Sequence, residues 1–236
     1  MTMRYVRTMK CQSLTLVEWM DGDPLVRRII TGRASREQYL AFLCSTYHYL
    51  RWSGSLLAAG AVDLRESGHY PQLWDILDAQ TNEQALSSRF LLDDIKALGA
   101  DAELVKASAA PSAIHAYVHK TWVMSQRSLT AFLGATYTLT FVSMHLAKTA
   151  AENLRARGQI PNIENAVSFL DAQGNAYARR IAQWNDILRQ IDDPHEQAAI
   201  LQSAATIRAL YPQFFFQRET RAITTSLPAR LNLRLN

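Results

Sequence analysis

Hydrophobic positions recur three and four residues apart along most of the chain. The clearest run falls between residues 40 and 64, where apolar or small side chains stand at positions 40, 43, 47, 50, 54, 57, 61 and 64. That spacing is typical of a helix sustained over three heptads. Ser35 offers an N-cap in front of it, and Gly68 follows its last turn. The pattern therefore predicts one helix of about thirty residues from Ser35.

The same periodicity predicts six further helices on either side of this one. They cover about residues 11–31 with an interruption at positions 22–24, then 71–98, 112–126, 127–157, 162–191 and 195–210. The fourth of these is expected to follow the third almost without a break. No strand-like alternation, internal repeat or linker interrupts the series. We expect an all-α fold, a single domain over residues 1–236 with about seven helices and an extended basic tail from about residue 219.

Composition supports this fold class and indicates the cellular location and the partners to expect. Apolar residues make up 48% of the chain, while 9 Gly and 7 Pro are too few for the many turns of a sandwich or barrel. Cys11 and Cys44 cannot form a cysteine-rich zinc site, which favours a reducing, cytoplasmic location. The net charge of +4 is small, so we expect no nucleic-acid partner.

One uncharged stretch of twenty residues, SLTAFLGATYTLTFVSMHLA between Arg127 and Lys148, is long enough to span a bilayer. Threonine, serine and histidine side chains dilute it, and the chain offers no second such stretch. We therefore expect a helix buried on all sides in a soluble core, and no membrane partner.

Polar side chains enter the apolar faces of two predicted helices. On a helical wheel of residues 162–191, Gln173, Tyr177 and Arg180 share the arc of the large hydrophobic residues. Glu83 and Ser87 do the same on the helix of residues 71–98. Burying such groups without partners is costly. The pattern predicts either a polar pocket between the two helices or a closed ion pair of Glu83 with Arg180.

Four stretches resemble the haem-oxygenase-like superfamily, in the branch that contains TenA-type thiaminases, PqqC-type cofactorless oxidases and di-iron oxygenases. They are DGDPLVRRIITGRASREQYLAFLCSTYHYLRW, NEQALSSRFLLDDIKALG, LGATYTLTFVSM and FLDAQGNAYARRIAQWNDIL, in the family's order over about residues 20–190. The resemblance implies the helical fold of that family, a small-molecule ligand and a homodimer, for which the aromatic cluster of residues 214–216 is a candidate contact.

The chain departs from this family at the metal-ligand positions. By resemblance to the di-iron members, Glu83 keeps a ligand position, whereas Ser87 and Thr140 replace a histidine and a glutamate. Gln173, Tyr177 and Arg180 replace the ligands of the last helix, and they are the residues that the helical wheel singles out. One carboxylate cannot hold two iron ions, and Arg180 places a positive charge beside them. We expect no metal and no other cofactor.

The remaining side chains predict a pocket for a small anionic or aromatic metabolite. Arg180 would anchor a carboxylate, Glu83 would act as general base, and Tyr177 and Tyr137 would stack or donate hydrogen bonds. Ser87, Thr140, Gln173, Tyr47 and Trp184 complete the expected lining.

Three functions remain open for such a pocket. Resemblance to PqqC-type members implies a cofactor-independent oxidase or related biosynthetic enzyme, in which Glu83, Tyr177 and Arg180 are the catalytic group. The alternative is a non-catalytic protein that binds a metabolite or a partner, in which Glu83 and Arg180 close on each other and leave little open volume. An iron-dependent oxygenase is the third possibility, if the ligand positions are shifted along the helices.

Overall fold

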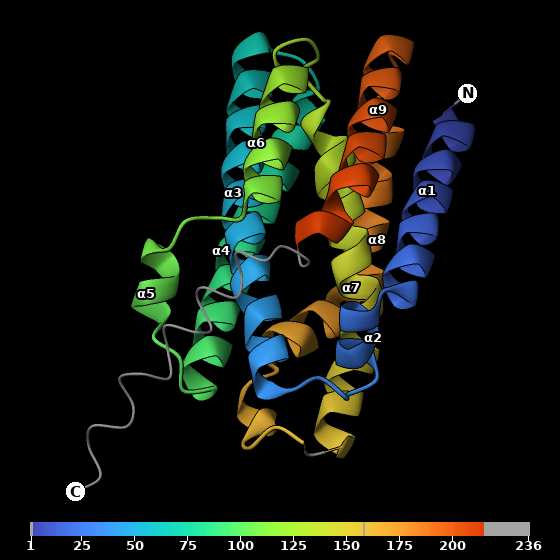
Figure 1. Cartoon of the computed structure of the whole chain (residues 1–236). Coiled ribbons are helices and arrows are strands. Elements are labelled where there is room, and N and C mark those ends of the chain that lie inside the picture. The colour runs from blue at the N-terminus through green and yellow to red at the C-terminus, as the bar shows by residue number, and fades with distance from the viewer. Residues whose placement is uncertain (1, 158, 215–236) are drawn as a thin grey trace, which may run out of the picture.

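The computed structural model describes residues 2–157 and 159–214, and every regular element in these ranges is helical. Seven long helices form the bundle, and two short helices lie in the connections between them (Figure 1). The long helices are α1 (Thr2–Gly22), α3 (Arg36–Ser67), α4 (Trp74–Ala97), α6 (Ser112–Ser125), α7 (Phe132–Arg157), α8 (Ser168–Arg189) and α9 (Pro194–Leu210). The short ones are α2 (Pro24–Ile30) and α5 (Ala102–Ala107). The predicted all-α class is confirmed, whereas the expected tail from residue 219 lies outside the described residues.

Local side-chain chemistry explains where the helices begin and end. Asp23 interrupts the first predicted helix, because its side chain accepts hydrogen bonds from the backbone amides of Leu25 and Val26 and so starts α2. Ser35 and Gln38 form a capping box at the start of α3. Gly68 and Gly99 follow α3 and α4 with φ angles of 71° and 75°, a conformation that glycine adopts without strain.

Two predicted helix boundaries and one predicted junction were wrong. α1 begins at Thr2 rather than near residue 11, and α8 begins at Ser168 rather than at Asn162. Asn162 adopts a left-handed conformation with φ of 57°, and a short 3₁₀ turn at Ile163–Asn165 follows it. The wheel pattern of α8 is therefore correct, but its first turn lies six residues later.

The junction between α6 and α7 is a separate turn over residues 126–131. The Glu196 side chain of α9 holds this turn, since its Oε2 accepts hydrogen bonds from Ser128 Oγ at 2.6 Å and from the Thr130 amide at 2.9 Å. A carboxylate that binds backbone amides fixes a loop firmly. α6 and α7 are therefore two distinct elements, and not the nearly continuous helix that the sequence predicted.

α7 lies at the centre of the bundle. It packs against α1, α2, α3, α6, α8 and α9, while α3 and α4 run side by side as an antiparallel hairpin (Figure 1). Most side chains of α7 between Phe132 and Leu154 are buried. From Phe132 onward the uncharged stretch is thus a core helix, as predicted, but it is not buried on all sides, since His145 is exposed. None of the described helices is long and apolar enough to cross a membrane.

The core consists of two apolar clusters with a polar layer between them. On α4, Leu77 belongs to the larger cluster and Leu91 to the smaller one; on α8, Ile181 and Leu170 are divided in the same way. The residues between these pairs, 78–90 on α4 and 171–180 on α8, include the polar side chains that the helical wheels place on the inner faces. The two clusters therefore leave room for a polar site in the middle of the bundle.

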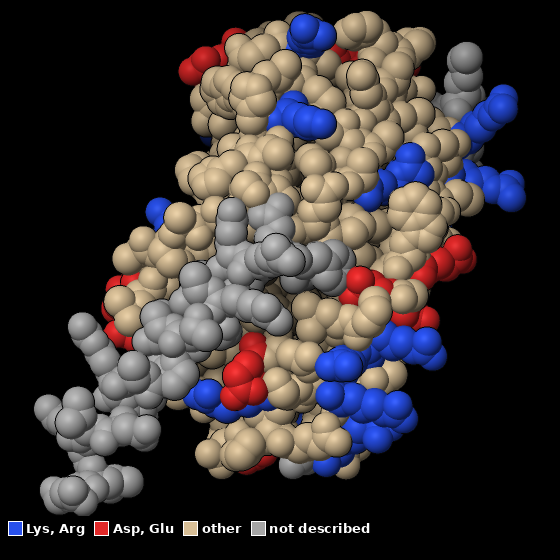
Figure 2. Space-filling view, viewed as in Figure 1, with Lys and Arg blue, Asp and Glu red and all other residues tan. Residues whose placement is uncertain are grey.

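Basic side chains gather at the lower end of the molecule, over α2 and the C-terminal end of α7 (Figure 2). The last turns of these helices carry Arg27 and Arg28, and Arg155 and Arg157. Arg157 Nε donates a hydrogen bond to the carbonyl of Thr31, the C-cap of α2, at 2.6 Å. Positive charges are favourable at helix C-termini, so these arginines have a structural role.

Candidate functional site

A polar cavity lies between α3, α4, α7 and α8, in the layer that separates the two apolar clusters. Its volume is about 30 Å³, which is room for a few waters rather than for a drug-sized ligand. Its lining consists of Tyr49, Leu50 and Ser53 of α3, Gln80, Glu83, Gln84 and Ser87 of α4, Thr136, Leu139, Thr140 and Ser143 of α7, and Gln173 and Arg180 of α8. Four helices therefore contribute polar side chains to one site.

Five of the predicted site residues meet in this cavity: Glu83, Ser87, Thr140, Gln173 and Arg180. Gln173 Nε2 donates a hydrogen bond to Ser87 Oγ at 3.0 Å, and Ser87 Oγ donates to the carbonyl of Glu83 at 2.9 Å. Gln173 and Ser87 are both buried. These bonds join α8 to α4 and hold the Ser87 and Gln173 side chains in place at the cavity.

An ion pair of Glu83 and Arg180 closes one side of the cavity. Arg180 Nε lies 2.7 Å from Glu83 Oε2, and the Arg180 side chain is only 11% exposed. The two atoms attract each other as charges but are not aligned as a hydrogen bond, and both are buried without any other hydrogen-bond partner. Burial lowers the pKa of the Arg180 guanidinium and Arg179 lowers it further, whereas the Glu83 carboxylate raises it.

Glu83 also binds a second arginine. Its Oε1 accepts a hydrogen bond from Arg179 Nη1 at 3.2 Å, and the Arg179 side chain is 59% exposed. Two guanidinium groups thus share one carboxylate, and Glu83 and Arg180 are the two charged residues among those that line the cavity. The three side chains therefore carry a net charge of +1 at the edge of a mostly buried polar site.

The four other predicted residues lie outside the lining of this cavity. The Tyr177 hydroxyl is 3.1 Å from His145 Nδ1, and the Tyr137 hydroxyl donates to Asn185 Oδ1 at 3.3 Å. Trp184 is fully buried in the larger apolar cluster, and Tyr47 packs in the smaller one. The structure therefore assembles the polar residues that the sequence predicted, but not the aromatic ones.

Several lining residues were not predicted as site residues. Thr136 and Ser143 flank the predicted Thr140 by four and three residues, so the three side chains share one face of α7. The sequence showed Thr136 and Ser143 only as polar interruptions of an uncharged stretch. Their spacing on one helical face was the available signal. Tyr49 and Ser53 on α3 have the same four-residue spacing and were missed for the same reason.

The residues that line this cavity do not fit a di-iron centre. Iron ions are held by carboxylates and imidazoles, and Glu83 is the one such side chain among the residues that line the cavity. Among the described residues, no three His, Cys, Asp or Glu side chains lie close enough together to hold a metal ion. The buried guanidinium of Arg180 would repel a dication at this place.

The geometry defines an all-α bundle with a polar cavity between its central helices, and solved structures share this architecture. A domain of unknown function with a haem oxygenase-like fold from Shewanella denitrificans OS217 is 14% identical, with a TM-score of 0.76, and covers 98% of this chain and 97% of its own. A TenA homologue from Pseudomonas syringae pv. tomato is 12% identical, with a TM-score of 0.67, over 94% of this chain and 93% of its own.

These two similarities show that the chain has the haem oxygenase-like fold over its whole described length. No family model matches the sequence, and no curated protein matches it significantly. The fold is therefore known, and the function has to be argued from the site.

Proposed function

We propose that this protein is a metal-free small-molecule-binding protein that takes an anionic metabolite at the polar cavity, with Arg180 as its anchor. The observation that carries the proposal is the charge of the site. Two arginines share the single carboxylate of Glu83, and the side chain of the inner arginine is only 11% exposed. A buried guanidinium needs a negative partner, and planar carboxylates match its geometry.

An incoming carboxylate can replace Glu83 at Arg180 without leaving Glu83 unpaired. Glu83 already contacts Arg179, which is half exposed and can keep the pair. The exchange would convert the unaligned contact of Glu83 Oε2 with Arg180 Nε into a hydrogen-bonded pair with the ligand. Ser87, Thr140 and Gln173 would offer polar contacts to the rest of a small ligand.

Binding is favoured over catalysis because the candidate base is not free. An enzyme needs open volume between a base and an electrostatic anchor, whereas Glu83 and Arg180 are in direct contact beside a cavity of about 30 Å³. Both carboxylate oxygens of Glu83 already contact guanidinium groups, Oε1 that of Arg179 and Oε2 that of Arg180. This geometry supports the non-catalytic alternative more than a cofactor-independent oxidase.

The test is a calorimetric titration with benzoate, which is both anionic and aromatic, and with benzyl alcohol as its uncharged counterpart. We expect saturable one-to-one binding of benzoate and none of benzyl alcohol. Arg180→Gln should weaken benzoate binding at least tenfold, because a hydrogen-bonded charge pair contributes about 1.5–3 kcal/mol. Arg179→Gln, the neighbouring arginine on the same helix, should weaken it no more than about threefold, since an exposed pair contributes less than 1 kcal/mol.

Two results would overturn the proposal. Equal losses in the two arginine variants would show that general charge, and not Arg180, attracts the anion. Binding of about two iron ions per chain after anaerobic incubation with Fe(II), measured by elemental analysis, would show that the site is a metal centre after all.

A further inference from the structure

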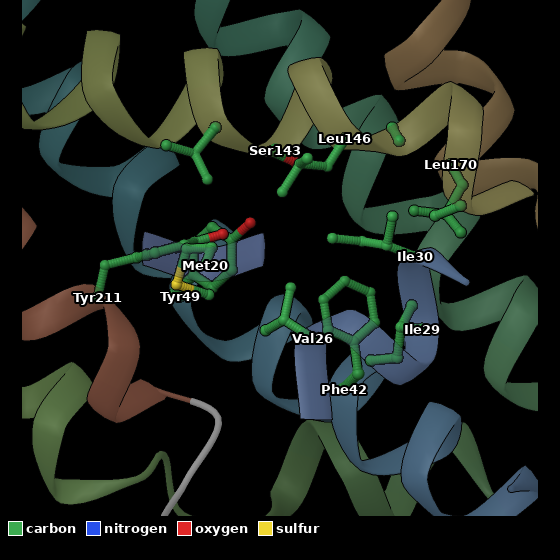
Figure 3. Close-up of a pocket in the computed structure, with 13 residues that line it drawn as sticks. Met20, Val26, Ile29, Ile30, Phe42, Tyr49, Ser143, Leu146, Leu170 and Tyr211 are labelled. Atoms are coloured by element: carbon green, nitrogen blue, oxygen red, sulfur yellow. The ribbon is translucent and has the colours of Figure 1, made fainter. Parts of the chain in front are cut away.

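A second cavity lies directly beside the polar one, and its lining is almost entirely apolar. It has a volume of about 40 Å³ and is bounded by α1, α2, α3, α7, the first turn of α8 and Tyr211 (Figure 3). Ile29, Ile30, Phe42, Leu146 and Leu170 surround the open space at its centre. Water gains little from an apolar cavity, so this space is available to an apolar group of a ligand.

The two cavities share a wall made of two side chains. Tyr49 and Ser143 line both of them, and their hydroxyl groups hydrogen-bond to each other. Tyr49 is also hydrogen-bonded to Tyr211, and burial raises its pKa, so its hydroxyl remains a neutral hydrogen-bonding group at neutral pH. A single pair of hydroxyls therefore separates a polar compartment from an apolar one.

Both compartments follow one face of α7. The lining positions on this helix are 136, 139, 140, 142, 143, 146, 147 and 150, and each of them has another lining position three or four residues away. Fourteen residues of helix extend about 21 Å. The end of this face near Thr136 and Thr140 is polar, and the end near Leu146 and Ala150 is apolar. The two cavities thus adjoin each other along this face, and Arg180 lines the polar one.

We infer that the two cavities are the two halves of one elongated site, and that its ligand is a carboxylate with an unbranched apolar chain. The inference rests on the proposed function and names its substrate class. The carboxylate pairs with Arg180, the chain passes between Tyr49 and Ser143, and its end lies among the apolar side chains around Leu146. The Tyr49 and Ser143 hydroxyls separate when the chain enters, and each cavity by itself is too small for such a ligand.

The experiment is a titration with the straight-chain acids from butanoate to decanoate, compared with the alcohols of the same lengths. Each added methylene should strengthen binding about three- to fourfold until the apolar chamber is full. The gain is the same at each step because every CH₂ group that leaves water adds the same binding free energy. The alcohols should bind at least tenfold more weakly at every length, since they lack the charge that Arg180 recognises.

Leu146→Phe tests where the chain lies, because the larger ring fills the apolar chamber. It should reduce the ratio of decanoate to butanoate affinity at least tenfold. Leu92→Phe is the matched control: Leu92 is a partly buried leucine of α4 that lines neither cavity, and this variant should keep the ratio of the wild type. An unchanged ratio in Leu146→Phe would overturn the inference.

A measurement without substitution guards against a variant that does not fold. Decanoate with a ¹³C-labelled terminal methyl group should give nuclear Overhauser contacts to the side chains of Ile29, Ile30 or Leu170 in the wild-type protein. Absence of these contacts in a saturated complex would overturn the inference. If benzoate and butanoate bind through Arg180 but longer chains bring no gain, only the elongated site fails; if no acid binds at any length, the proposed function fails with it.

Discussion

Two acidic residues of α4, Asp94 and Glu83, both contact α8, and they have opposite environments. Asp94 is fully buried, and both of its carboxylate oxygens accept backbone hydrogen bonds at 2.9 Å, Oδ1 from Ser168 and Oδ2 from Phe169. Glu83 lies three turns earlier, contacts two arginines, and leaves Oε2 without an aligned hydrogen bond. Both oxygens of the Asp94 carboxylate accept hydrogen bonds from backbone amides, whereas one oxygen of the Glu83 carboxylate accepts no aligned hydrogen bond.

The difference separates a structural acid from a binding acid. α8 has no capping side chain of its own at its first turn, and Asp94 supplies this cap from another helix. Nothing remains on Asp94 for a ligand to bind. Glu83, in contrast, shares its charge with a buried arginine that a ligand can take over. A buried acid near a cavity thus indicates binding only when its hydrogen bonds are incomplete.

Removal of the satisfied acid should have the largest effect on stability. Asp94→Ala leaves two buried backbone amides without acceptors, and we expect the free energy of unfolding to fall by about 3 kcal/mol at pH 7. Asp94→Asn keeps one carbonyl oxygen and should lose about half as much. Urea denaturation followed by circular dichroism measures both. A loss below 1 kcal/mol in the alanine variant would show that water replaces the cap.

The free energy of unfolding should also depend on pH through the ionisation of Asp94. Burial raises the pKa of Asp94 from 3.8 to about 6, although the amides of Phe169 and Ser168 lower it in part. A raised carboxyl pKa means that the folded state binds the proton more tightly than the unfolded state. The contribution of Asp94 is therefore most favourable below about pH 4 and decreases as the pH rises through 6, by about 3 kcal/mol in total.

Asp94→Asn provides the reference for this measurement, because it does not titrate. The stability of the wild type relative to this variant should decrease between pH 4 and pH 7 and remain level above it. A difference that is constant over this range would contradict the raised pKa. Both proteins carry the same other acids, so the subtraction isolates Asp94.

The fold was more predictable than the site because helices repeat a local rule. Spacings of three and four residues located the long helices, and Asp23, Ser35 and Gly68 marked helix ends through contacts within a few residues. Two of the errors arose where distant residues act. The turn between α6 and α7 depends on Glu196, and the start of α8 depends on Asp94. Neither dependence leaves a local signal.

At the site, the helical wheels predicted the charged and amide side chains but not the residues that divide the two cavities. Glu83, Gln173 and Arg180 stood out because polar groups on an apolar face are costly to bury. Tyr49 and Ser143 did not stand out, since a tyrosine or serine on a core helix is ordinary and only the structure shows that they divide two cavities. Tyr177 shared the arc with Arg180, yet it packs on His145 instead. A wheel gives the direction of a side chain but not the neighbour that it meets.

The smallest expected effect concerns the unsatisfied acid, and it changes binding as well as stability. Glu83→Gln removes the internal carboxylate that competes for Arg180, so benzoate should bind about fivefold more tightly, or about 1 kcal/mol. Without ligand, the free energy of unfolding should fall by about 1–2 kcal/mol, because Arg180 loses its negative partner while the pair is still partly exposed to water. Calorimetry measures the first quantity and urea denaturation the second.

Asp94→Asn is the matched control for this last experiment, since it neutralises the other buried acid of the same helix. Its benzoate affinity should equal that of the wild type, because both oxygens of Asp94 face the start of α8 and not the cavity. Weaker benzoate binding in Glu83→Gln would mean that Glu83 positions Arg180 for the ligand and does not compete with it. Both acids would then be positioning groups: Asp94 would hold the first turn of α8, and Glu83 would hold the guanidinium that binds the ligand.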